Sequence, residues 1–102
     1  MPSIDFRELR RRVLISDVLG VLGFEPTKRR GHRLRGSCPI HELGSAGTRT
    51  FSVDLDKNCF QCFGCGRSGN QLDLWAFTQR LPLHSAAVDL CDRLGIEVPC
   101  RP

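Results

Sequence analysis

Two stretches of sequence, Cys38-Pro39-Ile40-His41 and Cys62-Phe63-Gly64-Cys65, decide how this chain folds. Each stretch holds two metal-binding side chains three positions apart, and thiolate sulfur with imidazole nitrogen is a donor set that suits a tetrahedral zinc ion. Glycines at 64 and 66 relieve the backbone crowding of a tight turn around an ion. The spacing therefore predicts one zinc site with four ligands, Cys38, His41, Cys62 and Cys65. Because no coordination position stays open, the predicted ion is structural rather than catalytic.

The six cysteines in 102 residues also fit a disulfide framework of the kind found in small secreted proteins. However, the N-terminal residues 1–8 mix charged with apolar side chains and lack the continuous apolar stretch of a secretory signal. No run of about 18 apolar residues is present that could span a bilayer. We therefore expect a cytoplasmic protein without membrane association, whose cysteines bind metal rather than pair.

Two other interpretations of residues 62–69 are disfavoured. A thioredoxin-like redox pair at Cys62 and Cys65 needs a βαβ context with a helix that opens at the first cysteine. The run from Gly64 to Gly69 fits the G-x-G-x-x-G spacing of dinucleotide-binding loops, but two helices follow it rather than a parallel strand. Among the remaining thiols, Cys59 is an alternative ligand, Cys91 is expected in the core and Cys100 is expected to be free.

The hydrophobic pattern predicts an α+β fold, a small zinc ribbon with a short antiparallel sheet flanked by N-terminal and C-terminal helices. We expect one domain over residues 1–102 with three segments: a helical segment at 4–24, the zinc ribbon at 25–69 and two helices at 70–98. Short runs bounded by turn residues indicate three strands, at 32–37, 50–55 and 58–61.

Capping residues predict where the helices begin and end. Ser16 is suited to cap a short helix that Gly23 closes. Asn70 is suited to cap the first C-terminal helix, and Pro82 separates it from the second. Gly95 is expected to close the second helix.

The charge balance favours a polyanionic partner. Fifteen Lys and Arg residues against eleven Asp and Glu residues give a formal net charge of +4. Arg33 and Arg35 alternate with Leu34 on a predicted strand, so both arginines face one side of it. We predict a phosphate-binding track with Phe51 or Phe60 stacking on bases; its cations are Lys28, Arg29, Arg30, Arg33, Arg35, Arg49 and Lys57. The alternative is that both rings belong to the core and the charges are merely solvated.

Three stretches together, residues 38–41, 50–53 and 60–70, resemble the zinc-binding domain of bacterial DnaG-type DNA primases, and the resemblance extends over residues 15–98. It implies a zinc ribbon with one structural zinc ion on the four ligands named above. It also implies that the chain reads a single-stranded DNA template together with a separate polymerase domain. Residues 42–51 depart from the family pattern, because this link is longer than usual and lacks the usual proline.

The expected function is a zinc-dependent single-stranded DNA template-binding module of a DNA primase or primase-like replication protein. The catalytic carboxylates of a primase are absent, so we expect no enzymatic activity from the chain alone. The alternative is a zinc-stabilised protein-interaction module that docks on a primase catalytic domain, a polymerase or a helicase through Trp75, Phe77, Leu81 and Leu83. A complete enzyme is disfavoured, since no nucleophile–base pair is apparent.

Overall fold

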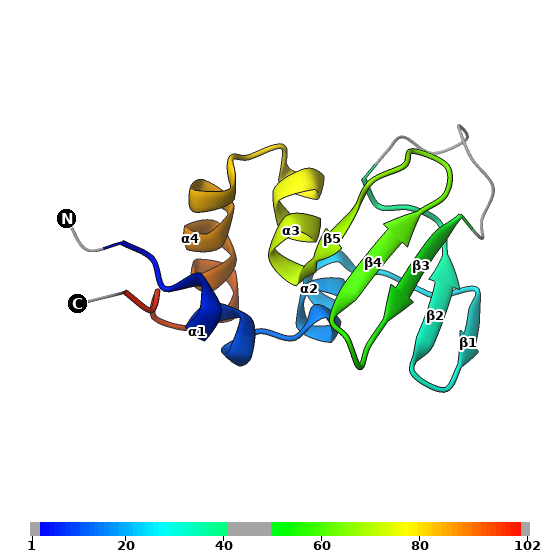
Figure 1. Cartoon of the computed structure of the whole chain (residues 1–102), viewed down its shortest axis with the longest axis horizontal. Helices are drawn as coiled ribbons and strands as arrows, with labels where there is room; N and C mark the ends of the chain where they lie inside the picture. Colours follow the sequence, from blue (N-terminus) through cyan, green and yellow to red (C-terminus); the bar gives the residue numbers. More distant parts are fainter. Residues whose placement is uncertain (1–2, 41–49, 101–102) are drawn as a thin grey trace.

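In the computed structural model, which describes residues 3–40 and 50–100, two helices precede an antiparallel sheet in the sequence and two helices follow it (Figure 1). The five strands lie in the order β1-β2-β3-β4-β5, and every neighbouring pair is antiparallel. The helices are α1 (Phe6–Arg12), α2 (Ile15–Leu22), α3 (Gln71–Gln79) and α4 (Leu83–Leu94). The strands are β1 (Lys28–Arg30), β2 (Arg33–Gly36), β3 (Phe51–Asp54), β4 (Cys59–Cys62) and β5 (Ser68–Asn70). The predicted α+β fold is confirmed.

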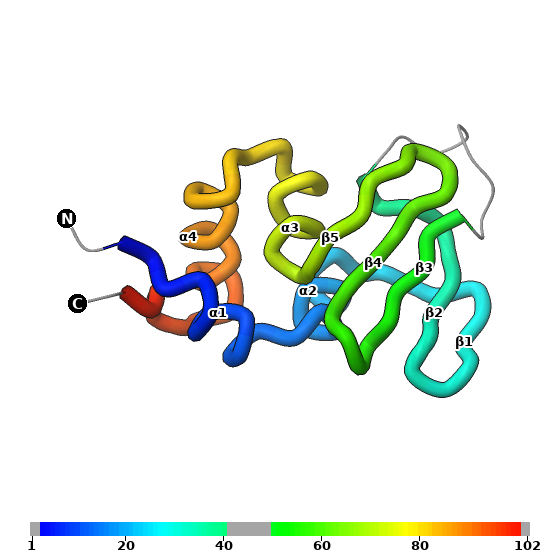
Figure 2. Tube along the Cα trace, viewed as in Figure 1, coloured from blue at the N-terminus to red at the C-terminus, as the bar shows by residue number. Residues whose placement is uncertain are grey.

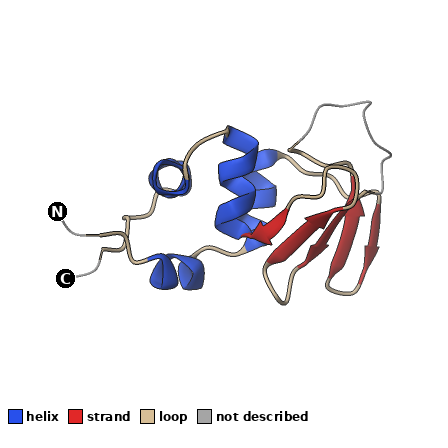
Figure 3. Ribbon diagram, turned by 45° about the horizontal axis from the view of Figure 1, so that its top comes forward, coloured by secondary structure: helices blue, strands red, loops and turns tan. Residues whose placement is uncertain are grey.

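One face of the sheet belongs to the core. Leu34, Val53 and Phe60 are aligned across β2, β3 and β4, and each is at most 7% exposed. Phe51 is fully buried, and its ring centroid lies 5.6 Å from that of Phe60 and 5.4 Å from that of Phe24. The helices gather at the β5 end of the sheet (Figure 3). The prediction that Phe51 or Phe60 stacks on bases is therefore wrong, because both rings fill this core.

The two edge strands were not predicted. Strand β1 consists of Lys28, Arg29 and Arg30, and β5 consists of Ser68, Gly69 and Asn70, so neither has the apolar alternation that indicates a strand. Both are extended because they complete the hydrogen-bond ladders of β2 and β4. Strand formation at these edges depends on neighbours in the sheet more than on intrinsic propensity.

The predicted helix ends are confirmed except at Ser16. Asn70 caps α3, where its side-chain oxygen accepts hydrogen bonds from the Leu72 and Asp73 amides at 2.9 and 3.0 Å. Gly23 and Gly95 close α2 and α4 in the left-handed conformation, both with φ of 69°. Ser16 does not cap α2, because the helix already begins at Ile15.

The helices are joined to one another by a buried amide. Gln71 is 2% exposed and donates from Nε2 to the carbonyl oxygens of Arg10 and Val13, at 3.0 and 2.8 Å. The two termini of the described chain also meet, since Ile4 and Cys100 form an isolated β-bridge (Figure 2). The first described residues thus lie beside the last described ones.

None of the four helices in residues 3–40 and 50–100 has the length and apolar character that a bilayer crossing requires.

Replacing Gly69 with alanine tests the packing between β5 and α3. A Cβ at Gly69 would lie 2.6 Å from Cβ of Asp73, whose carboxylate accepts a hydrogen bond from the Asn70 amide at 2.9 Å. Because Asp73 is held in place, Gly69→Ala is expected to lower the free energy of unfolding by about 1–3 kcal/mol. Urea denaturation of the zinc-loaded protein measures this change.

The matched control is Gly20→Ala, on α2. A Cβ at Gly20 meets no atom within 4 Å, so this substitution is expected to raise the free energy of unfolding by about 0.5–1 kcal/mol. Equal effects of the two substitutions would contradict the close approach at Gly69.

Candidate metal centre and basic sheet face

Three cysteine thiols meet at one end of the sheet. Cys38 follows β2, Cys62 is the last residue of β4 and Cys65 lies in the turn to β5. Their Sγ atoms all lie within 4.8 Å of one another. Sulfur atoms bound to one zinc ion, each at about 2.3 Å, are about 4 Å apart in a tetrahedron. The cluster therefore has the chemistry and the size that a zinc ion needs.

Backbone amides already point at these sulfurs. The Cys65 amide donates to Cys62 Sγ and the Ile40 amide donates to Cys38 Sγ, both at 3.4 Å. Burial alone would raise the pKa of the Cys62 thiol, but hydrogen bonds from the Cys65 and Gly64 amides and from neighbouring thiols hold this pKa below its usual value. The surroundings thus favour the thiolate, which is the form that binds metal.

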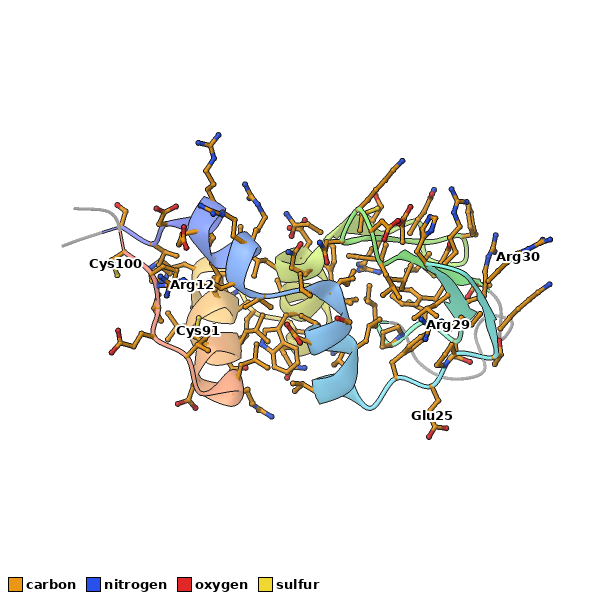
Figure 4. All side chains as sticks on the ribbon, turned by 90° about the horizontal axis from the view of Figure 1, so that it is seen from below. Arg12, Glu25, Arg29, Arg30, Cys91 and Cys100 are labelled. Atoms are coloured by element: carbon orange, nitrogen blue, oxygen red, sulfur yellow. The ribbon has the colours of Figure 1, made fainter. Side chains whose placement is uncertain are left out.

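The fourth predicted ligand and the three remaining cysteines are not part of this thiol cluster as described. His41 lies outside the described residues. Cys59 is on β4 but does not belong to the thiol cluster, because it is three positions from Cys62 and faces the opposite side of the strand. Cys91 is buried in the core on α4. Burial raises the pKa of its thiol, and the nearby positive charge of Arg12, which lowers this pKa, only partly offsets the effect (Figure 4). Cys100 has an exposed thiol.

The sheet face opposite the core is polar throughout. Partners directly across an antiparallel sheet share a face, so the strand register defines two rows on this side, which we call the outer face. One row is Lys28, Arg35, Ser52, Gln61 and Ser68. The other row is Arg30, Arg33, Asp54, Cys59 and Asn70. Four cations therefore come together on β1 and β2.

These four cations, Lys28, Arg30, Arg33 and Arg35, line a hollow of about 270 Å³. A second hollow of about 320 Å³ lies further across the outer face, where Arg33 and Lys57 line it together with Asp54 and with other residues of β3, β4 and β5. The two hollows share Arg33 and are therefore neighbours. The surface is concave as well as basic, as a phosphate-binding surface needs to be.

Two of the predicted cations are not part of this surface. Arg29 is aligned with Leu34 and so faces the opposite side of the sheet, where its Nε donates to the Gly31 carbonyl at 3.3 Å. Including Arg29 in the track was wrong, because successive residues of a strand point to opposite faces. Figure 4 labels Arg29 beside Arg30 at this edge of the sheet. Arg49 lies outside the described residues.

One acidic turn borders the basic surface. Partial burial raises the pKa of the Asp54 carboxyl, but hydrogen bonds from the Lys57 and Asp56 amides and the nearby charges of His32 and Lys57 lower this pKa overall. Imidazole nitrogens of His32 lie 3.8 Å from Asp54 Oδ1 and 3.5 Å from Asp56 Oδ2. These carboxylates thus stabilise a hairpin turn.

Phe63 is an exposed aromatic residue that was not predicted from the sequence as a stacking residue. It lies between Cys62 and Cys65, is 59% exposed, and has the Arg35 guanidinium 5.3 Å from its ring centroid. Its exposure could have been predicted from its position between Cys62 and Cys65, because a side chain in such a metal-binding turn points away from the core. An exposed ring next to a basic surface is suited to stack on a nucleobase.

Comparison with known proteins identifies the family. Residues 2–102 match the CHC2 zinc finger family. A DNA primase of Geobacillus stearothermophilus is 34% identical over 98 residues, which is 96% of this chain and 16% of the primase. A DNA primase of Aquifex aeolicus is 34% identical over 94 residues, which is 91% of this chain and 18% of the primase.

The structural comparison agrees. The crystal structure of the Aquifex aeolicus primase, with its zinc-binding and RNA polymerase domains, matches 96% of this chain and 23% of that chain, with a TM-score of 0.74 and 32% identity. The chain thus spans less than a quarter of the length of these relatives. With its thiol cluster and its ribbon sheet, the chain belongs to the CHC2 zinc finger family, is a zinc-binding domain of the DNA primase type, and has zinc as its cofactor.

Proposed function

We propose that this chain is a zinc-dependent module that binds single-stranded DNA template for a DNA primase or a primase-like replication protein. One observation carries the proposal: four cations, Lys28, Arg30, Arg33 and Arg35, line one hollow on the outer face of the sheet. The other face of the same sheet is buried. Cations gathered on an open surface attract the phosphates of a nucleic acid and release the counterions bound to them.

The neighbouring side chains suit a single strand more than a duplex. Ser52, Gln61 and Ser68 continue the row that contains Arg35, and they offer hydrogen-bond donors and acceptors to base edges. Phe63 offers a ring for stacking. Bases are free to stack on a protein ring and to present their edges only when they are unpaired, so this combination favours single-stranded DNA.

The zinc ion has a structural role in this proposal. We assign Cys38, His41, Cys62 and Cys65 as its ligands, which leaves no coordination position for a substrate. The ion connects the end of basic strand β2 to the turn that carries Phe63, and so sets the ring beside Arg35. The module has no catalytic site of its own, and polymerisation takes place in a separate domain.

A protein-docking module is the alternative. In its favour, Phe77, Leu81 and Leu83 are 37–42% exposed around the connection between α3 and α4. Two observations weaken it: Trp75, which that hypothesis included, is 1% exposed, and the Arg67 guanidinium lies 5.6 Å from the Phe77 ring centroid. Binding of single-stranded DNA by the unsubstituted, zinc-loaded protein would favour the template-binding function over this alternative.

The ligand assignment predicts which substitutions remove zinc. Cys62→Ser and His41→Ala are expected to lose the ion, because each removes one of four ligands. Structural zinc contributes about 10–16 kcal/mol of apparent binding free energy in small finger peptides, so the sheet is expected to unfold in both variants. Elemental analysis measures the zinc, and far-UV circular dichroism measures the fold.

The matched controls are Cys59→Ser and His32→Ala, since Cys59 is outside the thiol cluster and His32 is exposed. Both control variants are expected to keep one zinc ion per chain. Full zinc content in Cys62→Ser, or loss of zinc from Cys59→Ser, would refute the assignment.

The two arginines of β1 provide a matched pair for testing the basic surface. Arg30 is on the outer face and Arg29 is on the opposite face. Arg30→Gln is expected to weaken binding of a single-stranded oligonucleotide by up to about fivefold, or about 1 kcal/mol. It should also reduce the slope of log affinity against log salt by about 0.7, the value for one lost phosphate contact. Fluorescence anisotropy titrations at several salt concentrations measure both quantities.

Arg29→Gln removes the same charge from the same strand and is expected to leave the salt slope unchanged. Equal slopes for the two variants would argue against the outer face as the binding surface, and absence of binding by the zinc-loaded protein would refute the proposed function.

Phe63→Ala tests the stacking contact. Loss of one stacked base weakens binding by about 1–3 kcal/mol, while the salt slope should stay as in the unsubstituted protein because no charge is removed. Phe77→Ala is the control, since Phe77 is also partly exposed and also has an arginine over its ring. Unchanged affinity in Phe63→Ala would exclude stacking at this residue.

A further inference from the structure

A second group of cations lies away from the sheet, on α1. This helix, FRELRRR in sequence, contains four arginines and one glutamate, and all four arginines are exposed. Glu8 forms ion pairs with Arg11 at 3.5 Å and with Arg12 at 3.2 Å. Cations in the last turn of a helix also interact favourably with the helix dipole. Arg11 and Arg12 therefore have a role in stabilising the helix.

Arg7 and Arg10 lack such ion pairs in the described part of the chain, although Arg10, like Arg11 and Arg12, is in the last turn, where the helix dipole favours a cation. Within residues 3–40 and 50–100, neither side chain has an ion pair or a hydrogen bond. Arg7 is in the first turn, where the dipole disfavours a cation. Arg10 is three positions further on, so the two side chains are neighbours on the helix surface. They form a pair of cations on one side of α1 that has no ion-pair partner in the described residues.

Hydrogen bonds connect the end of α1 and the segment that follows it to elements next to the sheet. Gln71 connects the Arg10 and Val13 carbonyls to the start of α3, directly after β5. The Ile15 amide donates to Asn58 Oδ1 at 2.9 Å, and Asn58 follows Lys57 in the turn between β3 and β4. The chain between α1 and α2 therefore runs next to the turn that carries Lys57.

Helix α1 is on the same side of the molecule as part of the sheet. In Figure 4, α1 and the green strands lie toward the upper side, β1 and β2 lie lower at the right-hand end, and α4 lies below α1. Figure 1 shows α1 at one end of the long axis and β1 at the other. This axis measures 44 Å, and the turn between β3 and β4, which carries Lys57, lies between α1 and β1 in the same view.

We propose that Arg7 and Arg10 form a second phosphate-binding segment, which extends the basic track from the sheet past Lys57 onto α1. This inference rests on the proposed binding of single-stranded DNA. Its ligand is the phosphodiester backbone of the nucleotides that flank those on the sheet. Phosphate contacts of this kind position a strand without reading its sequence. A long strand contacts both segments, and a short strand contacts the sheet alone.

The experiment compares two strand lengths. Anisotropy titrations of the zinc-loaded chain use oligonucleotides of about 5 and about 16 nucleotides, near the two ends of the range of site sizes of OB-fold proteins that bind single strands. The longer strand is expected to show a salt slope steeper by about 1.4, because two more phosphates are neutralised at about 0.7 each. Arg7→Gln/Arg10→Gln should remove this difference and weaken binding of the long strand only.

The control is Arg12→Gln/Arg93→Gln, which also removes two positive charges. Arg12 pairs with Glu8 and lies beside Cys91 of α4 (Figure 4), and Arg93 is itself on α4, with Asp89 at 3.8 Å. The control variant is expected to keep the steeper slope for the long strand. Loss of that slope in the control would attribute it to net charge and overturn the proposal.

The two proposals fail in different ways. If both strand lengths bind with equal slopes, the second segment does not exist although the sheet binds DNA. If neither length binds the unsubstituted protein, the template-binding function fails and the second segment fails with it. Equal weakening of both lengths by Arg7→Gln/Arg10→Gln also contradicts a segment that only the longer strand reaches.

Discussion

The cluster of three thiols between the ends of β2 and β4 is the constraint on which the rest of this structure depends. Each strand of the sheet has only three or four residues, and strands this short are marginal on their own. A zinc ion at the cluster contributes about 10–16 kcal/mol, comparable to the whole stability of a typical domain at about 5–15 kcal/mol. The metal therefore determines whether the sheet, with its basic outer face, exists at all.

The two faces of the sheet differ in character: one belongs to the core and the other is basic and polar. The inner face carries Phe51 and Phe60, which complete the core. The outer face carries cations and polar residues instead, and four of its cations line one hollow. Phe63 escapes burial because it lies in the metal-binding turn rather than on a strand. Aromatic residues close together in sequence thus differ sharply in burial.

Hydrogen bonds between residues far apart in the sequence fix the helices relative to the sheet. Gln71 and Asn58 form hydrogen bonds with residues of the N-terminal segment, more than forty positions away in sequence. These buried or half-buried contacts are satisfied, and no buried side-chain nitrogen or oxygen in the described residues lacks a partner. Fully paired polar groups of this kind hold one arrangement of the elements, because an alternative packing would leave a buried amide unpaired. The charges on α1 therefore keep a defined position relative to the sheet.

The sequence by itself determined the local features of this protein. The spacing of the cysteines, the cap at Asn70 and the left-handed glycines at 23 and 95 are interactions within a few residues, so they can be predicted without knowledge of the fold. Only the tertiary structure decided that Lys28–Arg30 forms an edge strand, that Arg29 faces away from the other cations, and that Phe63 rather than Phe51 is exposed. Strand register and burial depend on residues far apart in sequence, and no local pattern contains that information.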